Sequence, residues 1–167
     1  MNKKAIIFGI KGEKLTKKEI IFLKKTKPWG IILFSRNVKD IFQLRNLIQS
    51  IKKLNKDDQY PILIDQEGGK VSRLNKVIDL SFFSQDYFAK LFLKDKNKFL
   101  NYYKIYINTV SNILNFVGIN INTVPVLDVR SKKAHDIIGS RSFSENPMTV
   151  STICSFCINL FKKNKIA

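Results

Sequence analysis

The sequence has 167 residues, of which 30 are lysine or arginine and 13 are aspartate or glutamate, and its formal net charge is +17. A hydrophobic fraction of 44% excludes a chain too polar to fold, and no apolar run approaches the roughly 18 residues that a membrane-spanning helix needs. The length predicts one domain, or part of a larger one. The apolar start stops at Ile10, so we expect a buried first strand in a cytoplasmic protein and not a secretory signal peptide.

The positive charge comes almost entirely from lysine. Of the 30 basic residues, 25 are lysines spread along the chain and five are arginines. Specific readout of bases and phosphates favours the arginine fork. We therefore expect no specific nucleic-acid partner, and at most weak, salt-dependent binding to nucleic acid.

Short apolar strands are predicted to alternate with amphipathic helices. The predicted strands are residues 5–10, 29–34, 61–64 and 119–126. The predicted helices are residues 17–25, a stretch that begins after Asp40, residues 81–92, 97–117 and 147–165. This order predicts an α/β fold in which parallel strands are joined by right-handed crossovers.

Capping residues predict where the helices begin and end. Thr16 and Glu19 have the spacing of a capping box, and Asp40 and Asn146 are suitable N-caps. Gly118 is a suitable C-terminal stop for the long helix. The apolar face of that helix is predicted from residues in helical register, namely Tyr102, Tyr106, Thr109, Ile113 and Val117.

The two cysteines, Cys154 and Cys157, are predicted to be buried thiols. They share a helix face with Val150 and Phe161. A zinc site would need two more cysteine or histidine ligands, and His135 is the only histidine. We therefore expect neither a metal nor an organic cofactor.

Polar residues follow the predicted strands, where parallel α/β folds collect their functional groups. Arg36 follows the second strand, residues 65–73 (DQEGGKVSR) follow the third, and Asp128 follows the fourth, with Arg141 a little further on. Carboxylates accept hydrogen bonds from hydroxyl groups and guanidinium groups donate them, so this rim suits a polyhydroxylated ligand. The Gly68-Gly69 pair lacks phosphate-loop spacing and predicts a sharp turn with positive φ.

Four motifs in the same order resemble glycoside hydrolase family 3. Residues 65–73 resemble its D-Q-E-G-G-R-V-x-R signature, with Lys70 in place of the usual arginine. The other three are residues 30–37 (GIILFSRN), 124–129 (VPVLDV) and 138–143 (IGSRSF). The resemblance is strongest to the bacterial β-N-acetylhexosaminidase (β-N-acetylglucosaminidase) branch.

The resemblance implies a TIM (β/α)₈ barrel whose enzymes remove non-reducing terminal N-acetylglucosamine from β-linked glycosides with retention of configuration. In cell-wall peptidoglycan recycling these substrates are muropeptides. By resemblance, Asp65, Arg73 and Arg141 would bind the terminal sugar. Arg36 and Asp128 are weaker candidates, which we expect to brace the site.

The family's catalytic residues are not found in these 167 residues. A retaining glycosidase needs a nucleophile and an acid/base, and the resemblance places the nucleophile Asp and the acid/base His beyond Ala167. His135 lies in the loop after the fourth strand and Glu67 has no family role as nucleophile. We therefore expect residues 1–167 to be the N-terminal half of the catalytic domain, truncated to about strands 1–4 and helices 1–4.

Such a half barrel leaves strand edges open. We expect the chain alone to be inactive, and either to self-associate through those edges or to need a complementing C-terminal half. The alternative is a non-catalytic remnant that binds amino sugars without cleaving them.

Overall fold

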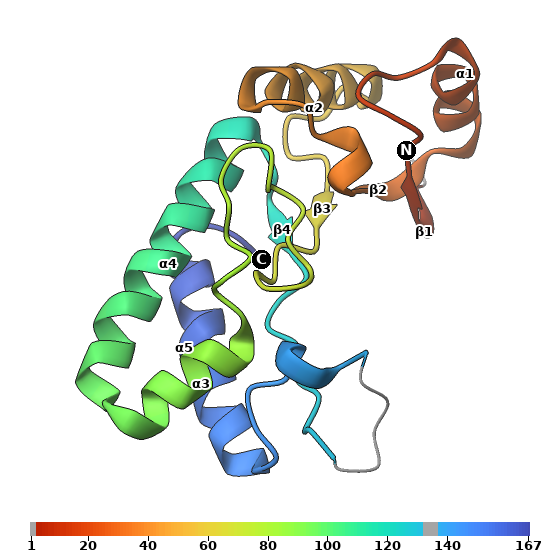
Figure 1. Cartoon of the computed structure of the whole chain (residues 1–167). Coiled ribbons are helices and arrows are strands. Elements are labelled where there is room, and N and C mark those ends of the chain that lie inside the picture. The colour runs from red at the N-terminus through yellow and green to blue at the C-terminus, as the bar shows by residue number, and fades with distance from the viewer. Residues whose placement is uncertain (1–2, 132–136) are drawn as a thin grey trace.

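The computed structural model describes residues 3–131 and 137–167, in which strands and helices alternate as predicted (Figure 1). The elements in chain order are β1 (Lys4–Gly9), α1 (Lys17–Thr26), β2 (Pro28–Leu33), η1 (Ser35–Asn37), α2 (Ile41–Asn55), β3 (Ile62–Ile64), α3 (Gln85–Lys94), α4 (Lys96–Val117), β4 (Ile121–Asn122), η2 (Gly139–Arg141) and α5 (Pro147–Lys163). His135 lies outside the described residues.

The four strands form one parallel sheet in the order β1-β2-β3-β4. Figure 1 shows α1 beside β1 at one end of the sheet, and α4 and α5 beside β4 at the other. Ala167 continues the sheet past β4, because its N–H donates to the Asn120 carbonyl at 3.0 Å and its carbonyl accepts from the Asn122 N–H at 2.8 Å. This is the parallel ladder pattern, and it lies directly after α5, where a fifth strand would follow in a (β/α)₈ barrel. The sheet is therefore that of the first strands of a (β/α)₈ barrel.

The predicted helix caps are present. The Thr16 side chain accepts from the Glu19 N–H and the Glu19 carboxylate accepts from the Thr16 N–H, which completes the capping box. Asp40 accepts from the Gln43 N–H at 2.8 Å, and Asn146 caps α5. Gly118 ends α4 with φ of +93°. These local signals fix where the helices lie along the chain.

The core lies between β2, β3 and the helices that cover them. Ile31, Leu33, Ile62 and Ile64 are fully buried in the two central strands. Aromatic rings extend the core toward α3, α4 and α5, where the Phe88 and Tyr103 centroids lie 4.5 Å apart. Burying each such side chain stabilises the fold by about 1.5–3 kcal/mol.

The prediction that the first strand is buried is wrong. Ile6 and Ile7 are each 41% exposed to solvent, and most of the other residues of β1 are exposed as well. In the described part of the chain β1 pairs with β2 alone, so its other edge has no neighbouring strand. An apolar sequence run identifies a strand, but burial depends on elements packed from both sides.

The predicted face of the long helix is confirmed only in part, and the fourth strand is shorter than predicted. Val117 is buried, and Tyr106 and Ile113 pack against the core, but Tyr102 is 52% exposed whereas the next residue, Tyr103, is buried. The buried residues of α4 are Phe99, Tyr103, Ile107, Val110, Ser111, Leu114 and Val117. α4 packs against α2, α3 and α5 together, so one apolar stripe in the sequence does not identify the face that becomes buried. β4 contains only Ile121–Asn122, and the chain leaves the sheet before the cis peptide bond between Val124 and Pro125.

Candidate sugar-binding site

The loop after β3 is folded back on itself by Gln66. The Gln66 N–H donates to Asn122 Oδ1 at 3.0 Å, which ties the loop to β4. Its side-chain oxygen accepts from the N–H groups of Arg73 and Leu74 at 2.8 and 2.9 Å, and its Nε2 donates to Ser72 Oγ. Gln66 is buried. One amide side chain therefore brings the end of the motif, Arg73, back beside its beginning.

The two glycines of this loop are required by its geometry. Gly68 and Gly69 have φ of +82° and +60°, which confirms the predicted sharp turn. A Cβ on Gly68 would overlap the Phe83 carbonyl, and one on Gly69 would lie 2.8 Å from the Ser84 Cβ. Only glycine adopts both the conformation and the close approach without strain.

Asp65 and Arg73 form an ion pair at the carboxyl end of β3. Arg73 Nη2 lies 3.3 Å from Asp65 Oδ2, and Thr123 donates its hydroxyl to Asp65 Oδ1 at 2.5 Å. In the described part of the chain, the bond to Asp65 is the only side-chain hydrogen bond that Arg73 donates. The buried Nε of Arg73 has no hydrogen-bond partner there. The pair is partly exposed. Arg73 therefore keeps N–H donors that a ligand hydroxyl could use.

Arg36 and Arg73 both approach the ring of Phe34. Their Cζ atoms lie 4.5 and 5.5 Å from the ring centroid. Arg36 Nε donates to the Ile10 carbonyl at 2.9 Å, which ties β2 to the end of β1. Arg36 thus contacts the backbone and an aromatic ring.

Arg141 is held by Glu67, a residue to which the sequence analysis gave no role. Arg141 Nε and Nη2 donate to the two carboxylate oxygens of Glu67 at 2.8 and 2.7 Å. The Glu67 side chain is only 5% exposed and that of Arg141 is 26% exposed. The hydrogen bonds to Glu67 raise the pKa of Arg141 above its ordinary value, and the charges of Asp128 and Asp65 add to the shift. Two donors are thus committed to Glu67, and Nη1 has no partner among the residues that the structure describes, so it can donate to a ligand.

The backbone of Arg141 is fixed as well, by the buried side chain of Gln85 at the start of α3. Gln85 Nε2 donates to the carbonyls of Arg141 and Val126 at 2.6 and 3.1 Å, and its Oε1 accepts from the Val126 N–H. Ser142 then donates its hydroxyl to the Asp128 carbonyl at 2.6 Å. α3 therefore joins η2 to the loop after β4. Asp128 itself is exposed and influences the site through its charge.

The structure thus brings Asp65, Arg73 and Arg141 to one rim. The sequence pattern could have placed Glu67 beside Asp65, since residues two apart at a strand end lie on the same side. It could not have identified Arg141 as the partner of Glu67, because the two residues are 74 positions apart. With the carboxylates of Asp65 and Glu67 bound to arginines, the rim can accept hydrogen bonds from hydroxyl groups and donate them.

Other chemistry is not supported by the described residues. Within residues 3–131 and 137–167, no three histidine, cysteine, aspartate or glutamate side chains are grouped to hold a metal ion. Cys154 and Cys157 are buried and reduced, as predicted, and burial raises their pKa values to about 11 and about 12. The described helices include none that is long and apolar enough to cross a membrane.

The parallel sheet with crossover helices, and polar groups at the carboxyl ends of its strands, are the arrangement of a barrel-type α/β domain. The glycosyl hydrolase family 3 N terminal domain matches residues 5–167. The chain belongs to this family.

Curated relatives are β-hexosaminidases. The chain is 41% identical over 73 residues to a β-hexosaminidase of Histophilus somni strain 2336, a match that covers 42% of this chain and 20% of the relative. It is 36% identical over 140 residues to β-hexosaminidase A of Pseudoalteromonas piscicida, covering 74% of this chain and 21% of the relative.

Solved structures agree with the family assignment. NagZ from Neisseria gonorrhoeae, in complex with N-trifluoroacetyl-D-glucosamine, superposes with a TM-score of 0.84 at 27% identity and covers 97% of this chain. A family 3 β-N-acetylglucosaminidase from Paenibacillus has a TM-score of 0.82 at 21% identity, which shows the fold. The chain spans 48% of the NagZ chain and 30% of the Paenibacillus chain.

Proposed function

We propose that residues 1–167 form the N-terminal half of a family 3 catalytic barrel, and that they bind the non-reducing terminal N-acetylglucosamine of β-linked glycosides. The observation that carries this proposal is the pair of arginine–carboxylate contacts on one rim, Arg73 with Asp65 and Arg141 with Glu67. It is supported by the family match and by the relatives named β-hexosaminidase. Muropeptides of peptidoglycan recycling, in the cytoplasm, are the substrates we propose.

Each residue has a distinct part in the proposed binding. Asp65 accepts hydrogen bonds from sugar hydroxyls through its exposed carboxylate edge. Arg73 and Arg141 donate to sugar oxygens with the N–H groups that their carboxylate partners leave free. Arg36 and Asp128 brace the rim, the former through the Ile10 carbonyl and the latter through its negative charge.

Catalysis, in this proposal, needs groups from outside the 167 residues. As the family resemblance implies, we place the nucleophile Asp and the acid/base His of the retaining mechanism beyond Ala167; Asp65 and Glu67 are both engaged by arginines. The partner that supplies them is a complementing C-terminal half. The open edge of β1 is where such a half, or a second copy of the chain, would pair.

The test is a titration of the full chain with N-acetylglucosamine, followed by amide NMR shifts. We expect saturable shifts in the loop of residues 65–73 and at Arg141, with a dissociation constant in the millimolar range because half a site lacks preorganised partners. Asp65→Asn should weaken binding by roughly 10-fold or more, since a hydrogen bond to a charged group contributes about 1.5–3 kcal/mol. Lys94→Gln, on the exposed end of α3, is the matched control.

Two results would count against the proposal. One is the absence of shifts at the rim when the chain is folded. The other is equal affinity for the sugar in the parent chain and the Asp65→Asn variant.

The non-catalytic alternative makes the same binding prediction and differs in hydrolysis. If joining the C-terminal half of a relative to the chain gives turnover of an aryl N-acetyl-β-glucosaminide, the chain is half of a glycosidase. If the joined protein folds and binds the sugar without turnover, the chain is an amino-sugar-binding remnant.

A further inference from the structure

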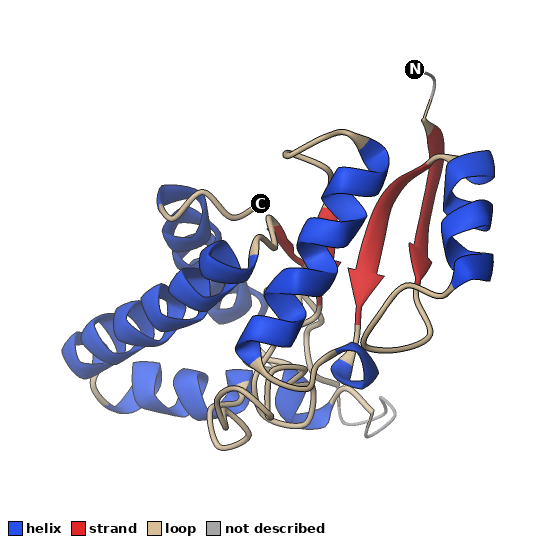
Figure 2. Cartoon of the chain, turned by 90° about the horizontal axis from the view of Figure 1, so that it is seen from above, coloured by secondary structure: helices blue, strands red, loops and turns tan. Residues whose placement is uncertain are grey.

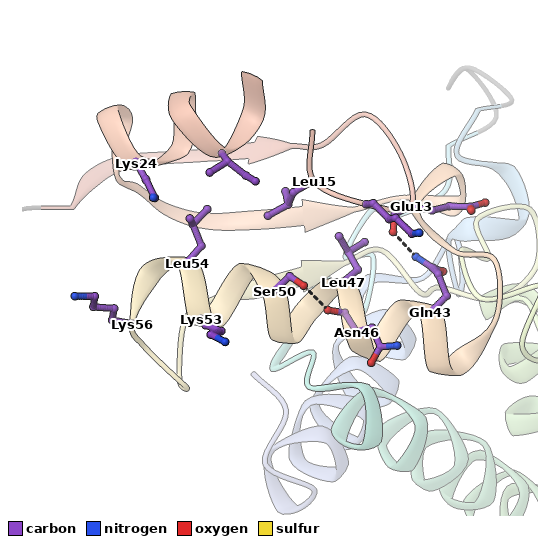
Figure 3. A pocket seen from close by; sticks show the side chains of 12 residues that line it. Glu13, Leu15, Lys24, Gln43, Asn46, Leu47, Ser50, Lys53, Leu54 and Lys56 are labelled. Atoms are coloured by element: carbon purple, nitrogen blue, oxygen red, sulfur yellow. Dashed lines mark hydrogen bonds between the residues drawn. The ribbon is translucent and has the colours of Figure 1, made fainter. Parts of the chain in front are cut away.

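An apolar hollow lies between α1 and α2, away from the proposed sugar site (Figure 3). Its volume is about 680 Å³, within the range of roughly 300–1,000 Å³ found for ligand sites. Leu15, Leu47 and Leu54 line it with Ile20. Leu15 precedes α1, Ile20 belongs to α1, and Leu47 and Leu54 belong to α2, the two helices that lie beside the strands in Figure 2.

Positive charge is gathered at one end of this hollow. Lys24 lies in the last turn of α1, Lys53 lies in the last turn of α2, and Lys56 is the C-cap of α2. Figure 3 shows all three lysines at the same end, beside Leu54. None of the three forms an ion pair with any residue that the structure describes.

The opposite end of the hollow carries side-chain amides. Gln43 and Asn46 lie there with Glu13, whose carbonyl accepts from Gln43 Nε2 at 2.7 Å (Figure 3). Lys14 also lines the hollow and is next to Glu13 in the sequence, so their formal charges cancel. The hollow therefore has three lysines at one end, an apolar middle and a near-neutral polar end.

We propose that this hollow binds an amphiphile with a single anionic head and an unbranched apolar chain, of the medium-chain carboxylate type. The head would contact the ammonium groups of Lys24, Lys53 and Lys56, and the chain would cover Leu15, Leu47 and Leu54. α1 has 10 residues and is about 15 Å long. The apolar middle of the hollow, which lies along this helix, therefore suits a short linear chain. An acidic peptide would need positive charge along the whole groove, whereas the lysines lie at one end of this hollow.

The hollow is separate from the sheet and from the proposed sugar site. It lies between two consecutive helices that the described chain contains, and none of its lining residues belongs to a strand, to the loop of residues 65–73 or to η2. The proposal therefore does not depend on the proposed sugar site.

The test is calorimetric titration of the full chain with decanoate and octanoate, both below their micellar concentrations. We expect decanoate to bind more tightly, by up to about 4-fold for each methylene buried. A cationic amine of the same chain length should not bind. Amide NMR shifts should be confined to α1, α2 and the loop before α1.

Two variants locate the ligand. The triple change Lys24→Gln, Lys53→Gln and Lys56→Gln should weaken decanoate binding at least 10-fold. Ser50→Phe, which keeps the charge and fills the hollow from an exposed position of α2, should weaken it by a similar factor. Circular dichroism would confirm that both variants fold.

A matched control separates the hollow from the general charge of the chain. Lys94→Gln, Lys104→Gln and Lys163→Gln remove the same charge from exposed positions outside the hollow and should leave decanoate binding within 2-fold. Equal losses in the two triple variants, or unchanged binding after Ser50→Phe, would overturn the proposal. Tighter binding of an acidic amphipathic peptide, or a dimer that Ser50→Phe abolishes, would assign the hollow to a different occupant.

Discussion

Replacing Glu67 with glutamine removes the charge that holds Arg141 and keeps the size of the side chain. The two hydrogen bonds at 2.8 and 2.7 Å need two acceptor oxygens, and an amide offers one oxygen and places an NH₂ group against the guanidinium. Because the Glu67 side chain is only 5% exposed, water cannot take over the lost contacts.

The expected loss of unfolding free energy is about 2–3 kcal/mol. Breaking a fully buried ion pair costs about 3–5 kcal/mol, and Arg141 is 26% exposed, so it can turn partly to solvent and recover some of that loss. A domain with a total stability of about 5–15 kcal/mol should still fold after such a change. The same variant should weaken N-acetylglucosamine binding, because Arg141 is no longer fixed toward the rim.

The assay is urea unfolding followed by circular dichroism, for the parent chain, Glu67→Gln, Arg141→Met and the double variant. The double variant should lose less than the sum of the single losses, since each single change leaves one buried partner unpaired. Asp57→Asn is the control, because the Lys3–Asp57 pair has the same 2.7 Å separation on the surface and its loss should be far smaller. Equal effects of Glu67→Gln and Asp57→Asn would refute the reasoning.

Three further predictions concern the thiols, an acid-sensitive ion pair and the open edge. Burial raises the pKa of Cys157 to about 12, so the thiols should react with a disulfide reagent at about pH 8 only after unfolding; rapid reaction of the folded chain would contradict this. Burial opposes ionisation of Asp86, yet hydrogen bonds from Lys90 and Arg130 hold its pKa below the ordinary value. The stability it contributes is present above the unfolded-state pKa of about 3.9 and is lost as the pH falls through the folded-state value. Asp86→Asn should therefore flatten the acid loss of stability, and an unchanged pH profile would count against this pair. Ile7→Lys should reduce self-association in size-exclusion chromatography with light scattering, whereas a monodisperse monomer of the parent chain would contradict the open-edge reasoning.

The elements were predictable because their signals are local. The capping box of Thr16 and Glu19 and the C-terminal stop at Gly118 lie next to the turns that they form. The positive φ of Gly68 and Gly69 follows from a turn within one motif. Each of these interactions spans a few residues, so the chain order is sufficient to find them.

The burial of β1 and of Tyr102 on α4 was mispredicted because it depends on distant neighbours. Ile7 lies in a fully apolar run, but its exposure is set by which strands lie beside it. Tyr102 and Tyr103 are adjacent and similar in character, and three packed helices decide which of them is buried. Periodicity within one helix does not contain that information.

The candidate site was only partly predictable for the same reason. The residues proposed to contact the sugar stand at strand ends and belong to recognisable motifs. The residues that position them follow no local pattern. Gln85 bonds to Arg141, which is 56 residues away in the sequence, and Glu67 bonds to the same arginine from 74 residues away. Such positioning contacts become visible only once the fold brings the loops together.

The most direct test of the central claim joins residues 1–167 to the remaining half of NagZ from Neisseria gonorrhoeae and measures hydrolysis of an aryl N-acetyl-β-glucosaminide. The account predicts turnover by the joined protein, none by the isolated chain, and a large loss of turnover when Asp65→Asn is introduced into the joined protein. Turnover by the isolated chain that persists through purification would contradict it. So would a joined protein that folds as a closed barrel and hydrolyses the glycoside equally well with and without Asp65.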